Sequence, residues 1–162
     1  MKKIPFKKIG YALLIILAFI QFYHPAGNNG EALSANDITH TVTVPDSVLK
    51  ILQTSCYDCH SNHTNYPWYH MIQPIGFWLD DHVNEGKREL NFSEYNTYKV
   101  KRQFKKLKKI SKEVEEKEMP LSSFTFIHHD AVLSESQRQL LINWADSASM
   151  TIHIPDSLGN AK

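Results

Sequence analysis

Apolar side chains recur three and four residues apart along much of the chain, which is the spacing of amphipathic helices. The clearest stretches lead into Cys56, run through residues 75–83, and fill residues 98–118 and the region after residue 134. Sustained alternation of apolar and polar positions, which is typical of half-buried strands, is absent from the sequence. The pattern therefore predicts an all-α domain.

Residues at the ends of these stretches predict where the helices begin and end. Pro45 suits the first position of a helix, and Gly86 is placed to end the second one. Pro120 stops the long third helix. Ser134 and Gln137 have the spacing of a capping box, which predicts that the last helix begins there.

The first 23 residues have the features of a membrane anchor. Residues 9–23 are apolar apart from Gln21, and four lysines precede them. The stretch that follows lacks the small-residue pattern of a good cleavage site, so an uncleaved transmembrane helix is favoured over a cleaved signal or a buried core helix. The positive-inside rule then predicts a single-pass protein of the inner membrane whose C-terminal domain faces the periplasm.

Composition divides the chain into four parts. Residues 1–23 are the basic tip and the anchor, and residues 24–42, which hold several Gly, Asn and Ser, are expected to form a flexible tether. Residues 43–152 form the working domain, and residues 153–162 form a frayed tail. The total of 162 residues suits one domain of this size.

Charge is unevenly distributed along the chain. Lys and Arg number 18 against 17 Asp and Glu, but four of the lysines precede residue 9. The remainder is mildly acidic, which argues against general nucleic-acid binding. The basic stretch Lys99–Lys112 is either a solvated helix face or a docking surface for an acidic redox partner or for anionic lipid headgroups.

The segment Cys56-Tyr57-Asp58-Cys59-His60 carries the clearest chemistry. Two cysteines separated by two residues and followed by histidine form the attachment signature of c-type haem. The two thiols can form thioethers with the vinyl groups of one porphyrin edge, and the adjacent imidazole can coordinate the iron. The motif therefore predicts one covalent haem c, bound through Cys56 and Cys59 with His60 as the proximal iron ligand.

Three other interpretations of the two cysteines stay open. A thioredoxin-like dithiol also uses this spacing, but it expects a βαβ context that the pattern does not show. A zinc site needs two further ligands, for which His63 and His70 are available. A structural disulfide is the third possibility for a domain that is exported.

Met119 is the best candidate for the sixth ligand of the iron. Its thioether is a soft ligand that stabilises ferrous iron, and Pro120 stiffens the loop that presents it. Ligation by a second histidine is the alternative, with His82 and His128 ahead of the other histidines. An open sixth position is the third possibility.

Four segments resemble the bacterial haem-binding domain family, which consists of single-haem, c-type cytochrome-like proteins. The resemblance covers about residues 43–148, and the order of elements also resembles class I cytochrome c. It implies a small all-α fold around a haem attached to Cys56 and Cys59, commonly preceded by one membrane segment. The segments are Thr54–Tyr69, His82–Ser93, Glu118–Pro120 and the helix that contains Trp144.

The expected function follows from the coordination of the iron. With Met119 bound, no position is open to a substrate, which favours a membrane-anchored single-electron carrier in the periplasm and not an enzyme. The alternatives are a haem-based ligand sensor and a peroxidase-like protein with His82 or His128 as distal acid or base. An anchored thiol–disulfide protein without haem is a fourth class.

Overall fold

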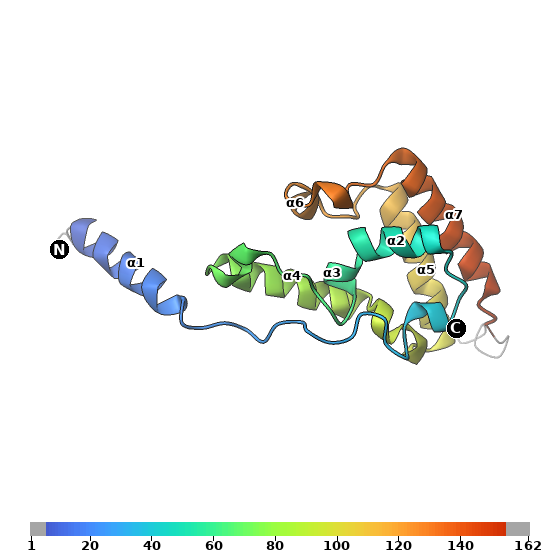
Figure 1. Cartoon of the computed structure of the whole chain (residues 1–162), viewed down its shortest axis with the longest axis horizontal. Helices are drawn as coiled ribbons and strands as arrows, with labels where there is room; N and C mark the ends of the chain where they lie inside the picture. Colours follow the sequence, from blue (N-terminus) through green and yellow to red (C-terminus); the bar gives the residue numbers. More distant parts are fainter. Residues whose placement is uncertain (1–5, 155–162) are drawn as a thin grey trace, which may run out of the picture.

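The computed structural model describes residues 6–154, which fold into helices joined by loops (Figure 1). No β-strand occurs within this range, so the predicted all-α class is confirmed. The α-helices are α1 (Phe6–Ile20), α2 (Asp46–Ser55), α3 (Tyr57–His60), α4 (Ile75–Glu89), α5 (Val100–Glu115), α6 (Ser122–Thr125) and α7 (Glu135–Thr151). Short 3-10 helices lie between them: η1 (Ile38–His40), η2 (Trp68–Met71), η3 (Phe92–Thr97) and η4 (His129–Ala131).

The core lies where α5 packs along α7 and α2 packs against α7 (Figure 1). Leu52 of α2, Leu107 of α5 and Leu141 of α7 are fully buried there. Removal of such side chains from water is the main favourable contribution to folding. Trp144 is also buried, and its indole N–H donates to the carbonyl oxygen of Thr43 at 3.0 Å. This packing fixes α2, the helix that leads into the cysteine motif.

The predicted start of α7 is confirmed, and α2 begins one residue later than predicted. Pro45 directly precedes α2 and has extended dihedral angles. At the start of α7, the backbone N–H of Gln137 donates to Ser134 Oγ at 3.3 Å. The Gln137 side chain in turn accepts from the backbone N–H of Ser134 at 2.9 Å, so the capping box is complete.

Two helix ends differ from the prediction. The second working helix, α4, continues through Gly86 to Glu89, because this glycine serves a tertiary contact that is described below. The long helix α5 ends at Glu115, five residues before Pro120. Lys117 takes a left-handed conformation with φ of 62°, and this residue turns the chain before the proline is reached.

The segment 24–42 packs against the domain, which differs from the flexible tether that its composition predicted. Ile38 is fully buried in the core, and the buried Asp37 accepts a hydrogen bond from Tyr57 at 3.0 Å. Closer to α1, the Asn28 side chain donates to the carbonyl oxygen of Ser61 at 3.0 Å. A few well-placed contacts thus order a segment whose average composition is loop-like.

Helix α1 stands apart from the core, and most of its side chains are exposed (Figure 1). Among residues 6–154, no helix combines the length and the apolar character needed to cross a bilayer. The helical winding continues as single turns beyond Ile20, where Phe22 N–H donates to Phe19 O and Tyr23 N–H donates to Ile20 O, both at 3.2 Å. Most of the predicted C-terminal tail, residues 155–162, lies outside the described residues.

Candidate functional site

The break between α2 and α3 presents the two cysteines and the histidine of the motif. Cys56 lies at the break with φ of −131° and ψ of −39°, and its carbonyl accepts from the backbone N–H of His60 at 2.9 Å. Tyr57, between the cysteines, is buried against Phe92 with a ring-centroid distance of 5.0 Å. This contact holds α3 against the rest of the domain. Cys56 and Cys59 remain partly exposed and line a cavity.

The ring of His60 is held by two backbone carbonyls. Its Nδ1 lies 2.9 Å from Gly86 O and 3.0 Å from Leu90 O, so Nδ1 carries the proton and donates to them. This arrangement leaves the lone pair on Nε2. Burial lowers the pKa of His60 below its usual value, which keeps the ring neutral near pH 7. A neutral imidazole with its second nitrogen held by a carbonyl is the usual form of a metal ligand.

Gly86 is required where α4 crosses α3. A Cβ atom at this position would lie 2.5 Å from the carbonyl oxygen of Cys59. The close approach lets Gly86 O reach the His60 ring, so one glycine serves both helix packing and ligand orientation. In sequence this glycine has the appearance of a helix end, and only the tertiary contact reveals its role.

We expect Gly86→Ala to destabilise the domain by about 1–3 kcal/mol, since the added methyl group forces α4 away from α3. Chemical denaturation measures the change. Gly10→Ala is the matched control, because a Cβ there meets nothing within 4 Å. Equal stability of Gly86→Ala and the unaltered chain would show that the two helices can separate without cost.

The motif opens onto an apolar cavity of about 370 Å³, within the range of small-molecule and cofactor pockets. Cys56, Cys59 and His60 form one wall, and Met119 lies on the lining as well. The structure therefore brings together five of the six site residues that the sequence singled out, since His82 also lies on the lining, across 64 positions of the chain. Apolar residues complete the wall: Leu90, Phe92, Ile110, Val114, Pro120, Leu121 and Phe124.

Met119 reaches the cavity through the turn that ends α5. The Glu118 N–H donates to Glu113 O at 3.0 Å and the Lys117 N–H donates to Val114 O at 3.3 Å, which together form a Schellman motif. The Met119 N–H also donates to Glu113 O, at 3.2 Å. The left-handed residue is a lysine and not the usual glycine, so the sequence gives little sign of this turn.

The two alternative histidines are placed differently. His82 lines the cavity, and its Nδ1 lies 2.8 Å from the carbonyl oxygen of Trp78, which leaves the Nε2 lone pair free. His128 is not among the lining residues. Its ring stacks on Phe124 at 4.4 Å, and its Nε2 lies 3.3 Å from the Tyr69 hydroxyl. The structure thus retains His82 as a competitor of Met119 and leaves His128 outside the cavity lining.

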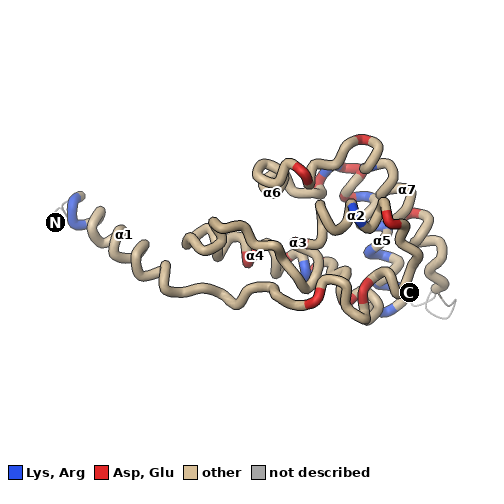
Figure 2. Tube along the Cα trace, viewed as in Figure 1, with Lys and Arg blue, Asp and Glu red and all other residues tan. Residues whose placement is uncertain are grey.

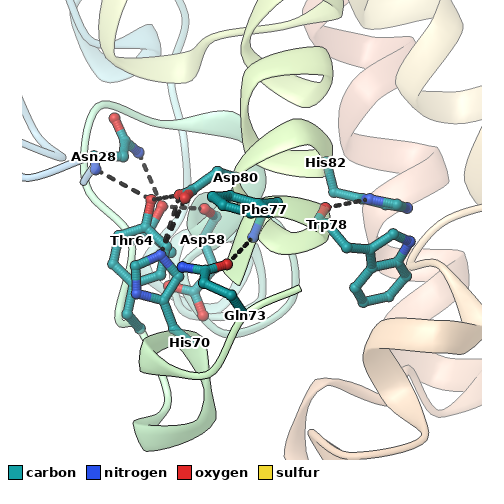
Figure 3. Close-up of polar contacts among 10 residues, drawn as sticks. Asn28, Asp58, Thr64, His70, Gln73, Phe77, Trp78, Asp80 and His82 are labelled. Atoms are coloured by element: carbon teal, nitrogen blue, oxygen red, sulfur yellow. Dashed lines mark hydrogen bonds and ion pairs between the residues drawn. The ribbon is translucent and has the colours of Figure 1, made fainter. Parts of the chain in front are cut away.

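His70 belongs to a polar cluster on the opposite side of α4 from His82 (Figure 3). Its Nε2 lies 3.2 Å from both carboxylate oxygens of the buried Asp80. Tyr66 donates to the same carboxylate at 2.9 Å and stacks on the His70 ring at 3.9 Å. These contacts hold the loop before α4 in place, and they give His70 a structural role.

Two of the other interpretations of the cysteines, the redox dithiol and the zinc site, lose support. Burial raises the pKa of the Cys56 thiol to about 12 and that of Cys59 to about 11, whereas dithiol oxidoreductases depend on a lowered thiol pKa. In the part of the chain that the structure describes, no group of three or more His, Cys, Asp or Glu side chains is placed to hold a metal ion. A four-ligand zinc site therefore has no ligand set there.

Charged side chains form the rim of the cavity: two lysines of the basic stretch Lys99–Lys112, and glutamates that the sequence did not single out. Lys106 and Lys109 of α5 lie 3.4 and 2.9 Å from a carboxylate oxygen of Glu89 at the end of α4. Hydrogen bonds from these lysines lower the pKa of Glu89. The rim thus combines two lysines with three carboxylates, those of Glu85, Glu89 and Glu113, around an apolar interior, a suitable boundary for a ligand with an apolar body and a charged edge.

These features fit a haem. The cavity is apolar where a porphyrin face needs it, two thiols and a neutral imidazole line the same wall, and a soft thioether lies on the lining. The model of the haem-binding domain family matches residues 15–147, which is most of the chain. Comparison with curated proteins and with solved structures gave no match. The predicted haem binding is confirmed, and the chain belongs to the haem-binding domain family.

Proposed function

We propose that this protein is a membrane-anchored, periplasm-facing c-type haem protein that carries single electrons. The observation that supports this proposal best is the convergence of Cys56, Cys59, His60 and Met119 on one apolar cavity. A CxxCH segment alone is a short motif. The same motif combined with a neutral histidine that donates to backbone carbonyls, and with a thioether from a distant turn, is much more specific for haem.

In this proposal Cys56 and Cys59 would hold one haem c through thioethers, and His60 and Met119 would be the two protein ligands of its iron. Bound haem supplies a one-electron ferric/ferrous couple, and thioether ligation favours the ferrous state relative to a second imidazole. The apolar lining, including Ile110, would pack against the bound haem. The bonds from Nδ1 of His60 to two carbonyls hold the imidazole in a fixed orientation.

Carbon monoxide binding distinguishes the carrier from a sensor or peroxidase-like protein. The ferrous holoprotein should bind carbon monoxide slowly or not at all, because Met119 already fills the sixth position. The measurement is the absorption spectrum after the gas is added, and the double variant Met119→Ala/His82→Ala serves as the control that opens the site. Rapid binding by the unaltered protein would contradict the carrier proposal and favour a sensor.

Membrane attachment through α1 is part of the proposal. The helix and its terminal turns run from Phe6 to Tyr23, about 27 Å at 1.5 Å per residue, against about 30 Å for the hydrocarbon core. Lys7 and Lys8 at one end and Phe22 and Tyr23 at the other are suited to the two interfaces, and local thinning of the bilayer accommodates a short helix. The lysines then lie in the cytoplasm and the haem domain lies in the periplasm.

The partner surface that we propose is the exposed start of α5, called the basic face here and formed by Lys99, Lys101, Arg102 and Lys105. Within the described residues these side chains make no ion pair, whereas Lys108 pairs with Asp146 at 2.7 Å. The basic face is continuous with Lys106 and Lys109 of the cavity rim. An acidic redox partner that docks there lies near the cofactor edge.

Reversal of one charge on the basic face should slow oxidation of the ferrous holoprotein by ferricyanide, an anionic probe. For Lys105→Glu we expect a decrease of about threefold at low salt that vanishes at high salt, because the field is screened. Stopped-flow spectroscopy gives the rate. Lys50→Glu on α2 is the matched control with the same change in net charge. If both variants slow equally, net charge and not the basic face is responsible.

A further inference from the structure

Three segments of the chain hold no Asp, Glu, Lys or Arg: residues 9–30, 59–79 and 119–129. They are far apart in sequence, yet parts of them meet at one end of the structure. Gln21, just after α1, donates to Gln73 O and accepts from Gln73 N–H, both at 2.9 Å. Tyr23 also packs on Phe77 with ring centroids 5.7 Å apart. The end of α1 is therefore fastened to the loop that begins α4.

The third segment reaches the same end through the loop of α6. The Tyr69 hydroxyl of η2 lies 3.3 Å from Nε2 of His128, which joins the loop of α6 to η2. Figure 2 shows the consequence, since charged residues are largely absent from the tip of α4 and from the loop of α6. The basic face of α5 lies elsewhere, in the body of the domain.

This uncharged end carries large exposed side chains. Trp68 is 78% exposed, Met71 is 60% exposed and Phe126 is 79% exposed. Ile72, Ile75, Trp78 and Ile127 are also exposed. We call this set, together with Phe22 and Tyr23, the apolar tip. A group of large exposed apolar residues on a folded domain marks a binding surface.

We propose that the apolar tip inserts into the interfacial layer of the lipid bilayer beside α1 and so docks the haem domain directly on the membrane. This inference rests on the proposed anchoring by α1. Trp and Tyr are the residues that favour the membrane–water interface, and the lack of charge removes the desolvation cost of entry. The Gln21–Gln73 bonds place the tip where the anchor leaves the membrane.

Docking would fix the orientation of the haem domain relative to the membrane. The segment 24–42 is bound along the domain, so the domain does not swing freely from α1. With the apolar tip in the interface, the α5–α7 end extends away from the lipid, where soluble partners reach it (Figure 1). Apolar side chains make this contact with the membrane, so the docking should depend little on salt or on anionic lipid.

The test uses the full chain in vesicles of phosphatidylethanolamine and phosphatidylglycerol. Trp68 is replaced by the photoreactive residue benzoylphenylalanine, and in a matched control Met150 at the end of α7, 81% exposed, is replaced instead. After illumination, mass spectrometry measures lipid adducts on each variant. Proximity to lipid predicts at least about tenfold more adduct at position 68 than at position 150.

The possible outcomes separate the two proposals. If the full chain stays in the supernatant when the vesicles are sedimented, both the anchor and the docking are wrong. If it sediments and the two positions give equally little lipid adduct, the anchor stands and the docking is overturned. Adducts at position 68 that join two protein chains would also overturn it, because the apolar tip would then be a contact between copies. Haem content is measured on the same samples, because haem binding is expected whether or not the chain sediments with vesicles or forms lipid adducts.

Discussion

Simultaneous replacement of Cys56 and Cys59 by serine is expected to abolish covalent attachment of haem completely. The chain has two cysteines in all, so the variant leaves no thiol that can form a thioether. Haem staining after denaturing electrophoresis should then show no band, even when the variant accumulates to normal levels. The change is all-or-none because denaturation removes a haem that is held by coordination and packing alone.

The single replacements refine this expectation. Cys59→Ser retains Cys56, so a weaker band should persist through one thioether. Tyr57→Phe is the control for disturbance of the fold, since it removes the buried hydrogen bond to Asp37 and leaves both thiols. It should cost about 1–3 kcal/mol of stability and keep the band, because the carboxylate is left without this partner. A full band from the double serine variant would refute thioether attachment.

Met119→Ala should produce the second large effect, on the spectrum and the reduction potential. Loss of the thioether removes the weak far-red ferric band of sulfur ligation and lowers the potential by on the order of 0.1 V, within the span that axial ligands set. Met150→Ala is the matched control, because Met150 is exposed at the end of α7 and does not line the cavity. Optical spectra and a redox titration give both quantities.

His82→Ala is the necessary companion of that experiment. The ring of His82 lines the same cavity, and its Nε2 lone pair is free. If Met119→Ala leaves the ferric spectrum unchanged and His82→Ala converts it to high spin, the sixth ligand is His82 and the assignment to Met119 is wrong. The unaltered His82 also matters in Met119→Ala, where it can move onto the iron and restore a low-spin spectrum.

Local sequence signals were sufficient for the helices and for one wall of the site. Helical periodicity identified α2, α4, α5 and α7, and the capping box at Ser134 marked a helix start that the structure reproduces. The motif at Cys56 predicted haem binding, which the family match confirms. These features succeed because each is encoded by residues that are close together in the chain.

Features that depend on tertiary contacts were not predictable in this way. Gly86 has the appearance of a helix terminator until Cys59 O is seen beside it, and Lys117 adopts a left-handed turn that favours glycine. The segment 24–42 looks like a tether, yet Ile38 is fully buried. In each case one contact with a distant part of the chain outweighs the local preference.

The most direct test of the central claim is the state of the haem in the full chain, produced in a host that matures c-type cytochromes. Denaturing electrophoresis with haem staining should show haem on a band near 18.7 kDa, and extraction with acidified organic solvent should leave the colour with the protein. The native spectrum should be low-spin. A colourless band with all haem in the solvent would contradict attachment through Cys56 and Cys59.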